Sequence, residues 1–327
     1  MAAILSCTFR RAGPGMCVLG GFNTLIRKWL SRGGFRRRFA RASSGPGLVD
    51  ELARRIDGSA DDGAELIGAL ADRLHVKSTA RLAESLTPTR ELDYPRHLIR
   101  LVISSPAIGR RLDSVAKEPF TVDWLETIEP GDVFYDIGAN VGPYSLIAAK
   151  ATGGRAGVLA FEPSPASFAA LARNVEINEC SGCVTPLPLA LWSETGLVPV
   201  SWRSGEAGRA RHRLDTETES ASRVVGIRLD DFVEKLGGPV PTHAKVDVDG
   251  YELDVLLGAE RTLARPEWRS IMVELDRKES QRNQEIRNLP ATTGFGSGVR
   301  IERTPTRRYP HPERRPDVYW NFTRRAA

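Results

Sequence analysis

The chain has 327 residues, of which 41% are hydrophobic and 27% are charged, an ordinary composition for a globular protein of one or two domains. No run of 18 apolar residues occurs, which excludes a membrane-spanning helix, and four cysteines are too few for a disulfide framework. The net charge of +5 is unevenly distributed along the chain. Nine basic and no acidic residues precede Asp50, so the rest of the chain carries a net charge of −4.

Residues 1–47 are rich in Arg, Gly and Ser, and we expect a basic, disordered arm because this composition cannot bury a core. An acid-free, Arg-rich start is also typical of an organelle transit peptide, and a basic arm can touch an anionic membrane surface or a nucleic acid. No cleavage site follows a solid apolar core, which argues against a secretory signal. Cysteine usage indicates a reducing compartment, so we expect a cytoplasmic protein.

Residues 48–116 are interpreted as a helical cap or extension, and residues 117–327 as the main domain. Two helices are predicted in the cap by apolar residues spaced by four: Leu48, Leu52, Ile56, Leu66, Leu70 and Leu74. A further helix, packed beside the first strand, is predicted where Phe120, Trp124 and Ile128 follow the same spacing.

The segment Val133–Ser145 organises the main domain. Val133–Ile137 is rich in β-formers, a glycine-containing turn from Gly138 to Gly142 follows, and a helix begins at Pro143, where proline costs no hydrogen bond. Strand, glycine turn and helix together open a nucleotide-type site in a doubly wound α/β sheet. The ligand of such a site lies beyond the carboxyl end of the strand, over the helix N-terminus.

Asp136 indicates which ligand this site takes. Its carboxylate stands at the strand's carboxyl end, where it would line the pocket and repel the pyrophosphate of a dinucleotide. S-adenosylmethionine brings an ammonium and a sulfonium instead, and an acidic residue suits both. The spacing Gly138-x-x-x-Gly142, with Asn140 in the middle, is also not the dinucleotide fingerprint.

Glu162 follows the second strand, Gly157–Phe161, and lies 20 residues after Gly142, the spacing of an acid that binds both ribose hydroxyls. A third strand is predicted over Val184–Leu191 despite its two prolines. Trp192, at its end, would either stack on adenine or be a buried aromatic. A hairpin of 197–202 with 223–227 is expected, with a mobile polar loop between them near the pocket mouth.

The fourth strand begins at His243 and brings carboxylates to the place where the transferred group would be presented. Asp247 is our first candidate for a general base, with Asp249 or Glu252 second, and an orienting carboxylate without proton transfer is an equal alternative for Asp247. His243 lies at the wrong end of the strand. A fifth strand, Ser270–Leu275, precedes a closing antiparallel pair at 298–302 and 317–322. No cluster has metal-ligand spacing, and we interpret Cys180 and Cys183 as incidental.

Five segments together resemble the FkbM family of class I S-adenosylmethionine-dependent methyltransferases: Lys117–Leu125, Tyr135–Leu146, Phe161–Pro165, Leu229–Phe232 and Lys245–Glu252. The resemblance implies an α/β, Rossmann-like sheet of seven mostly parallel strands with a reversed last strand, and O-methylation of a hydroxyl. By position, Asp136, Gly138, Asn140 and Gly142 would hold the methionine end of the cofactor and Glu162 the ribose. Asn178 matches the asparagine that closes the second helix. Asp249 departs from the family, which has glutamate, and so does Pro143.

We therefore expect a methyltransferase that takes a hydroxyl-bearing acceptor, without a stable nucleic-acid partner. The main alternative is a nucleic-acid-binding protein or RNA methyltransferase that uses the basic arm on phosphates. A nicotinamide dehydrogenase is a second alternative, and both Asp136 and the missing middle glycine argue against it.

Overall fold

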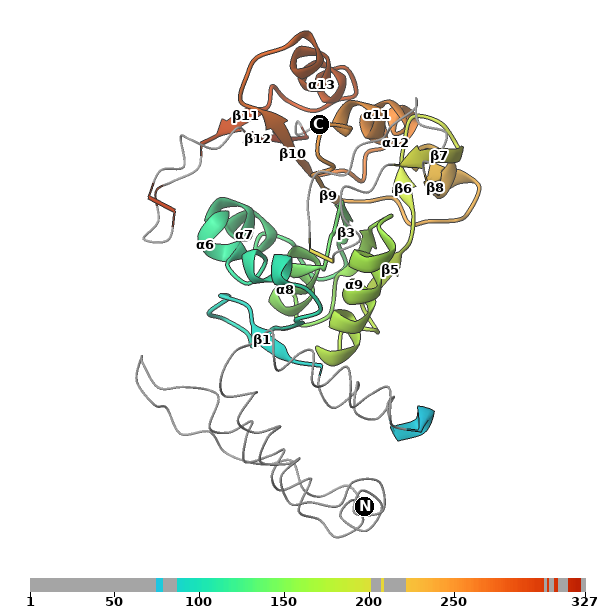
Figure 1. The fold of residues 1–327 in the computed structure, drawn as a ribbon. Helices are drawn as coiled ribbons and strands as arrows, with labels where there is room; N and C mark the ends of the chain where they lie inside the picture. Colours follow the sequence, from blue (N-terminus) through green and yellow to red (C-terminus); the bar gives the residue numbers. More distant parts are fainter. Residues whose placement is uncertain are drawn as a thin grey trace, which may run out of the picture. The chain divides into compact units, whose positions relative to one another are not determined.

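The computed structural model describes residues 75–78, 87–200, 207–208, 222–302, 305, 309–310 and 317–324. The chain divides into two compact units, residues 1–86 and 87–327, and the fold described here is that of the second (Figure 1). The expected basic arm and the two helices expected between Leu48 and Leu74 lie outside the described residues. No described helix is both long and apolar enough to cross a membrane.

A seven-stranded sheet forms the centre of this unit. Its strands are β3 (Val133–Ile137), β4 (Gly157–Phe161), β5 (Val184–Leu187), β9 (His243–Val246), β10 (Ser270–Asp276), β11 (Val299–Ile301) and β12 (Asp317–Thr323). They lie in the order β11-β12-β10-β9-β3-β4-β5. All neighbours from β10 to β5 are parallel, and β12 lies antiparallel between β10 and β11. The predicted mostly parallel sheet, its reversed last strand and the closing antiparallel pair are therefore confirmed.

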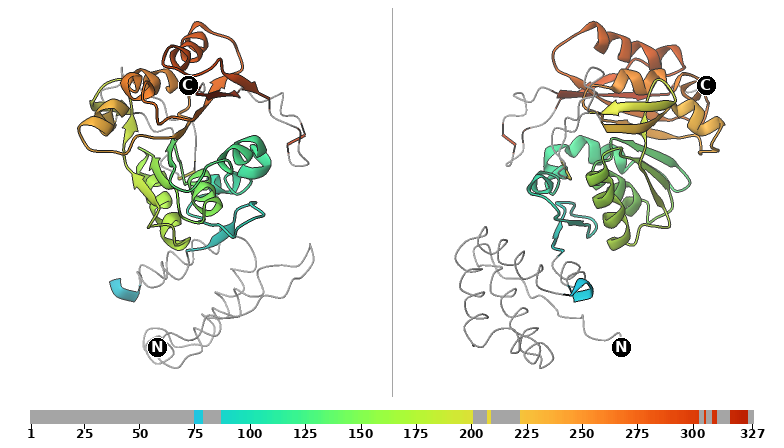
Figure 2. Two further views of the ribbon diagram at one scale, coloured as in Figure 1. Left: turned by 180° about the vertical axis from the view of Figure 1, so that it is seen from behind. Right: turned by 45° about the vertical axis from the view of Figure 1, so that its right-hand side comes forward.

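Helices cover both faces of the sheet (Figure 2). One face is covered by α6 (Ser114–Lys117), α7 (Pro119–Leu125), α8 (Pro143–Ala151) and α9 (Pro165–Ile177), and the other by α10 (Leu229–Glu234), α11 (Glu252–Leu257), α12 (Glu260–Leu263) and α13 (Gln281–Thr292). Since side chains alternate along a strand, Phe134 packs with the first group and Tyr135 with the second. The helix predicted around Trp124 is α7, and the Trp124 ring lies 5.8 Å from that of Phe134 on β3.

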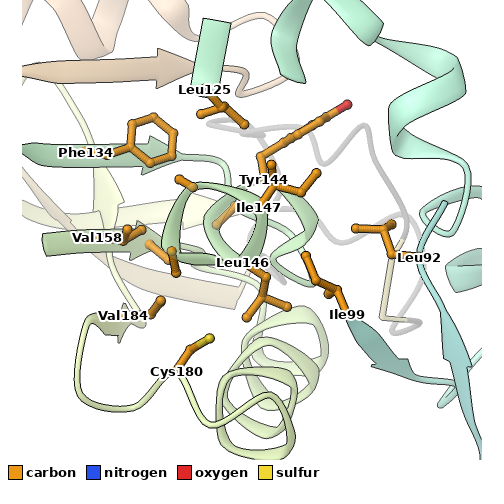
Figure 3. Close-up of a cluster of buried hydrophobic side chains, with 14 of the residues drawn as sticks. Leu92, Ile99, Leu125, Phe134, Tyr144, Leu146, Ile147, Val158, Cys180 and Val184 are labelled. Atoms are coloured by element: carbon orange, nitrogen blue, oxygen red, sulfur yellow. The ribbon is translucent and has the colours of Figure 1, made fainter. Parts of the chain in front are cut away.

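The helix α8 is buried on nearly all sides, which is why its sequence is apolar all round. Leu146 and Ile147 are inaccessible to solvent. They lie between the sheet, represented by Val158 and Val184, and Ile99 on the opposite side (Figure 3). The helix that follows the glycine turn is therefore fixed in place by the core.

The region 87–116, which we expected to continue a helical cap, is not mainly helical. It forms β1 (Thr89–Glu91) and β2 (Arg100–Val102), an antiparallel pair, then the 3-10 helix η1 (Pro106–Arg110) and the short α6. Two asparagines, one within α9 and one at its C-cap, form hydrogen bonds with the main chain of β2. Asn174 Oδ1 accepts from Val102 N at 2.7 Å, and Asn178 bonds both N and O of Arg100. The main domain therefore includes residues before 117.

The single strand expected at Val184–Leu191 is two strands in different sheets. β5 ends at Leu187 because Pro188 has no N–H to donate, whereas Pro186 is tolerated because β5 is an edge strand. The chain then continues into a separate three-stranded sheet of β6 (Ala190–Leu191), β7 (Gly196–Val200) and β8 (Ser222–Ile227). The pairing of β7 with β8 confirms the predicted hairpin. The loop expected between them lies outside the described residues except for 207, 208 and 222.

Candidate active site

The turn after β3 is held by main-chain contacts that only glycine permits. Gly138 and Ala139 both donate from N to the carbonyl of Phe161 at 3.0 Å. Gly138 has φ +85°, and a Cβ added there would lie 2.0 Å from the carbonyl oxygen of Asp247. Gly142 also has φ +85°, with Leu171 in the space that a Cβ would fill. The two glycines therefore bring the main chain of β3 against that of β9 and start α8.

Glu162 lies at the carboxyl end of β4 and is 4% exposed. Its two oxygens accept from the main-chain N of Asn140 and of Ser164, each at 2.8 Å. Burial raises its pKa to about 7, against the effect of these two donors. Each carboxylate oxygen has a second lone pair, so the side chain, already fixed in orientation, can still accept hydroxyls of a ligand.

Asp136 lies deeper than the sequence suggested. We expected its carboxylate to line the pocket, but the residue is 1% exposed, and Ser145 Oγ of α8 donates to it at 2.5 Å. Burial raises the pKa of Asp136, while Lys245 acts in the opposite direction. Asp136 thus joins β3 to α8.

Asp247 follows β9 and lies beside the turn. Lys245 Nζ donates to Asp247 Oδ2, and Glu274, near the end of β10, shares a hydrogen bond with the Asp247 carboxyl group. Burial alone would raise the pKa of Asp247, but Lys245 and the bond with Glu274 hold it well below its usual range. Burial and the neighbouring charge of Asp247 raise the pKa of Glu274 well above its usual range.

Lys245 itself is 1% exposed. Its ammonium lies 4.8 Å from the ring centre of Tyr144 and 5.7 Å from that of Tyr319. Burial would lower its pKa, but four carboxyl groups outweigh burial and raise it: Asp247, Glu118, Asp136 and Glu274. The lysine is therefore charged and compensates a buried acidic cluster.

The other two acidic candidates have different surroundings. Glu252, the first residue of α11, is 5% exposed and accepts from Gly250 N at 2.9 Å and Val248 N at 3.3 Å. Burial raises its pKa to about 7. Asp249 is exposed and has φ +53° in the same turn. Glu252 therefore holds the turn that carries Asp249.

Trp192 lies beside this turn, half-buried, with its ring 5.3 Å from that of Tyr251. The structure thus brings Asp136, Gly138, Asn140, Gly142, Glu162 and Asp247 together at the carboxyl ends of β3, β4 and β9, and it places Asp249, Glu252 and Trp192 around the neighbouring turn. Adenine stacking on Trp192 stays a prediction.

The sequence analysis gave no role to the buried charged residues around Asp247 and Lys245. Lys245 and Glu118 lie in segments that carry the family resemblance, and Glu274 lies near the end of the fifth predicted strand. Glu118 is inaccessible to solvent, with Lys117 Nζ 2.6 Å from its Oε1. Charged residues at alternate positions in apolar strands were a signal, because such positions share one face of the sheet.

These residues fit S-adenosylmethionine by the chemistry of their groups. The carboxylate of Asp247 lies at the strand end where the cofactor's ammonium and sulfonium would be held, with Asp136 buried behind it, and Glu162 is oriented for a ribose. The sheet order with its reversed strand, the glycine turn and the acid after the second strand define a class I methyltransferase fold.

Residues 136–295, just under half of the chain, match the model of the methyltransferase FkbM domain. Hexuronic acid methyltransferase AglP of Haloferax volcanii is 35% identical over 139 residues, 42% of this chain and 54% of the relative. Methyltransferase sdnD of Sordaria araneosa is 29% identical over 154 residues, 38% of this chain and 59% of the relative. The chain thus matches little more than half the length of these relatives.

Among solved structures, the FkbM methyltransferase of Methylobacillus flagellatus KT is similar with a TM-score of 0.42 and 15% identity. The similarity covers 83% of this chain and 60% of that one.

Proposed function

We propose that the protein transfers a methyl group from S-adenosylmethionine to an oxygen atom, a hydroxyl of a small molecule or of a glycan. The family match supports methyl transfer, and the similarity to a hexuronic acid methyltransferase supports a sugar-like acceptor. When bound, the cofactor supplies a methyl group on a sulfonium, so that the protein's task is to align the acceptor and exclude water.

The observation that carries this proposal is the arrangement of Glu162. Its carboxylate is fixed by the main chain of Asn140 in the glycine turn and of Ser164 before α9, at the strand end where a ribose would lie. Asp247 touches the same turn through its main chain and has an anionic side chain. A carboxyl group for the ribose, that of Glu162, and an anion for the reacting end, that of Asp247, lie on either side of Gly138.

Of the two roles open to Asp247, the contacts favour orientation of the acceptor hydroxyl, with uptake of its proton only as the oxygen is methylated. Its depressed pKa keeps it ionised at neutral pH, which makes it a constant hydrogen-bond acceptor and only a weak base. Glu252 is occupied with the amides of its own turn, so we propose a structural role for it and a secondary role, toward the acceptor, for Asp249.

Calorimetric titration of the full chain with S-adenosylmethionine, S-adenosylhomocysteine and NAD tests the cofactor. We expect binding of the first two and not of NAD. Glu162→Ala should lose this binding, whereas Glu176→Ala, which removes an exposed acid on the following helix α9, should keep it. Transfer of labelled methyl groups to a panel of hydroxyl-bearing sugars, including hexuronic acids, then tests the reaction. A folded protein that binds neither sulfur compound contradicts the proposal.

The location and the arm remain proposals from the sequence. We propose that the protein acts in the cytoplasm and that residues 1–47 make a weak contact with an anionic membrane surface. Sedimentation of the full chain with anionic vesicles, at low and at high salt, tests the second point, because an electrostatic contact is lost at high salt.

A further inference from the structure

Five polar residues from four strands lie on one face of the sheet. Asp136 is in register with Lys245 across β3 and β9, and Lys245 is in register with Met272 across β9 and β10. Asp247 follows Lys245 by two residues and Glu274 follows Met272 by two, so the same register places Asp247 beside Glu274. Glu274 is in turn in register with Tyr319 on β12. The alternation of side chains directs all of them toward α7 and α8.

Hydrogen bonds divide these residues into two groups, one around Asp247 and one around Glu274. Lys245 donates to Asp247, whereas Tyr319 Oη donates to Glu274 Oε1 at 2.7 Å. One position beyond the pairing of Val246 with Val273, the register of β9 with β10 places the carboxyl groups of Asp247 and Glu274 beside each other. Two neighbouring carboxyl groups repel each other when both are ionised, so the pair is more stable when one of them holds a proton. Because the ammonium is bonded to Asp247, the negative charge is most stable there and the proton is most stable on Glu274.

We propose that Asp247 and Glu274 act as one proton-sharing carboxyl pair that binds the acceptor hydroxyl, with Glu274 as its protonated member and Lys245 as the positioning residue that keeps the charge on Asp247. This inference rests on the proposed methyl transfer. It adds Glu274 and Lys245 to the site and assigns opposite protonation states to two acids that sequence alone cannot distinguish.

The pair accounts for the proton of the reaction. The acceptor hydroxyl donates to the Asp247 carboxylate, its oxygen forms the bond to the methyl carbon, and the carbon–sulfur bond breaks with its electrons remaining on sulfur. The hydroxyl proton passes to Asp247 and then to solvent. A carboxylate of low pKa is basic enough, because the proton of a hydroxyl becomes strongly acidic as its oxygen is methylated.

The isosteric variants Glu274→Gln and Asp247→Asn separate the two roles. The glutamine amide can accept from Tyr319 and donate to Asp247, as a protonated glutamate does, so kcat should stay within about tenfold of wild type. Asn at 247 removes the anion, and kcat should fall by about 100-fold or more. If Glu274→Gln abolishes turnover, or if Asp247→Asn does not reduce it, the assignment is overturned.

Lys245→Met gives a readout that a purely structural role would not produce. Besides Asp247, the groups that face this ammonium are Asp136, Glu118 beside Lys117, Tyr144, Glu274 and Tyr319. Without the lysine, the Asp247 carboxylate takes up a proton more easily. The acid limb of kcat/KM against pH should therefore move to higher pH, and an unmoved limb in a folded variant contradicts the positioning role.

Infrared spectroscopy tests the pair without any acceptor. At neutral pH the wild-type chain should show the carbonyl band of a buried protonated carboxyl group, and Glu274→Gln should lose intensity in it. Glu279→Gln, which changes an exposed acid paired with Arg287, should leave the band unchanged. An unchanged band in Glu274→Gln overturns the proton assignment even if methyl transfer is confirmed. Failure of the wild type to bind S-adenosylmethionine instead refutes the proposed function and leaves the infrared result standing.

Discussion

Gly138 is the residue at which the turn has least freedom. A side chain there would need a left-handed backbone and would collide with the main chain of Asp247, which cannot move without moving β9. We expect Gly138→Ala to lower the free energy of unfolding by about 2 kcal/mol or more and to weaken S-adenosylmethionine binding strongly. Gly157→Ala is the matched control, because nothing lies within 4 Å of its added Cβ. Urea denaturation and calorimetry of both variants decide the point.

His243 belongs to a second polar group on the same sheet face, at the opposite end of the strands. Its ring lies between Ser270 Oγ at 2.8 Å and Asp132 Oδ2 at 3.2 Å, as expected for a residue far from the site. Burial lowers its pKa, although Asp132 acts in the opposite direction. The ring is therefore neutral in the folded protein at pH values at which the unfolded chain already binds a proton.

This depressed pKa makes stability depend on pH. The contribution of His243 is complete above the ordinary histidine pKa of about 6.5 and is lost as pH falls below it, since the unfolded state then binds more protons. We expect His243→Gln to reduce the loss of stability between pH 7.5 and 5.5, and the exposed His97→Gln to leave it unchanged. Equal slopes for all three proteins in urea denaturation would contradict this.

The contribution of Glu252 to stability depends on pH in the direction opposite to that of His243. With its pKa raised to about 7, it folds most favourably when protonated, and it costs stability as pH rises from its unfolded pKa, about 4.3, to that value. Gln can keep the bonds to Gly250 and Val248 without a buried charge. We expect Glu252→Gln to be more stable than wild type by about 1–3 kcal/mol at pH 8, with little difference at pH 4. It should remain active, and loss of turnover at unchanged stability would restore Glu252 as a catalytic candidate.

At the scale of elements, α9 links the β1–β2 hairpin to the glycine turn after β3. Asn174 joins β2 to the glycine turn, because it accepts from Val102 N and donates to Val141 O at 2.8 Å. Asn174→Ala should cost about 3 kcal/mol, since it leaves a buried donor and a buried acceptor without partners. Asn288→Ala, in the exposed part of α13, should cost far less. Thermal denaturation of the two variants measures the difference.

Elements marked by a local sequence motif could be predicted from the sequence. Elements that form only through contacts with residues distant in the chain could not. The turn from Gly138 to Gly142 and the position of Glu162 follow from spacing alone. The strands β1 and β2 have three residues each and show no alternation, and β2 is stabilised by side chains of α9. Likewise, the pairing of Asp247 with Glu274 depends on the register of β9 with β10, which no sequence motif encodes.

At the scale of the whole molecule, the second unit begins at Thr87 rather than at Lys117. Residues of the β1–β2 hairpin and its loop belong to the main core, among them Leu101 and, as Figure 3 shows, Leu92 and Ile99. We expect a chain that starts at Thr87 to unfold cooperatively and to bind S-adenosylmethionine as the full chain does. A chain that starts at Lys117 should aggregate, and a soluble, cooperative protein from that start would contradict the boundary.

The position of β3 in the middle of the sheet has a kinetic consequence. Its register partners on β4 follow closely in the chain, but His243 on β9 follows Phe134 by 109 residues. Local pairing forms faster than distant pairing, so β3, β4 and β5 with α8 and α9 can assemble while β9 is still absent. Such an intermediate exposes an unpaired apolar edge on β3, where another chain can add a strand. Refolding should therefore lose yield as protein concentration rises, and a chaperone that holds this intermediate should restore the yield.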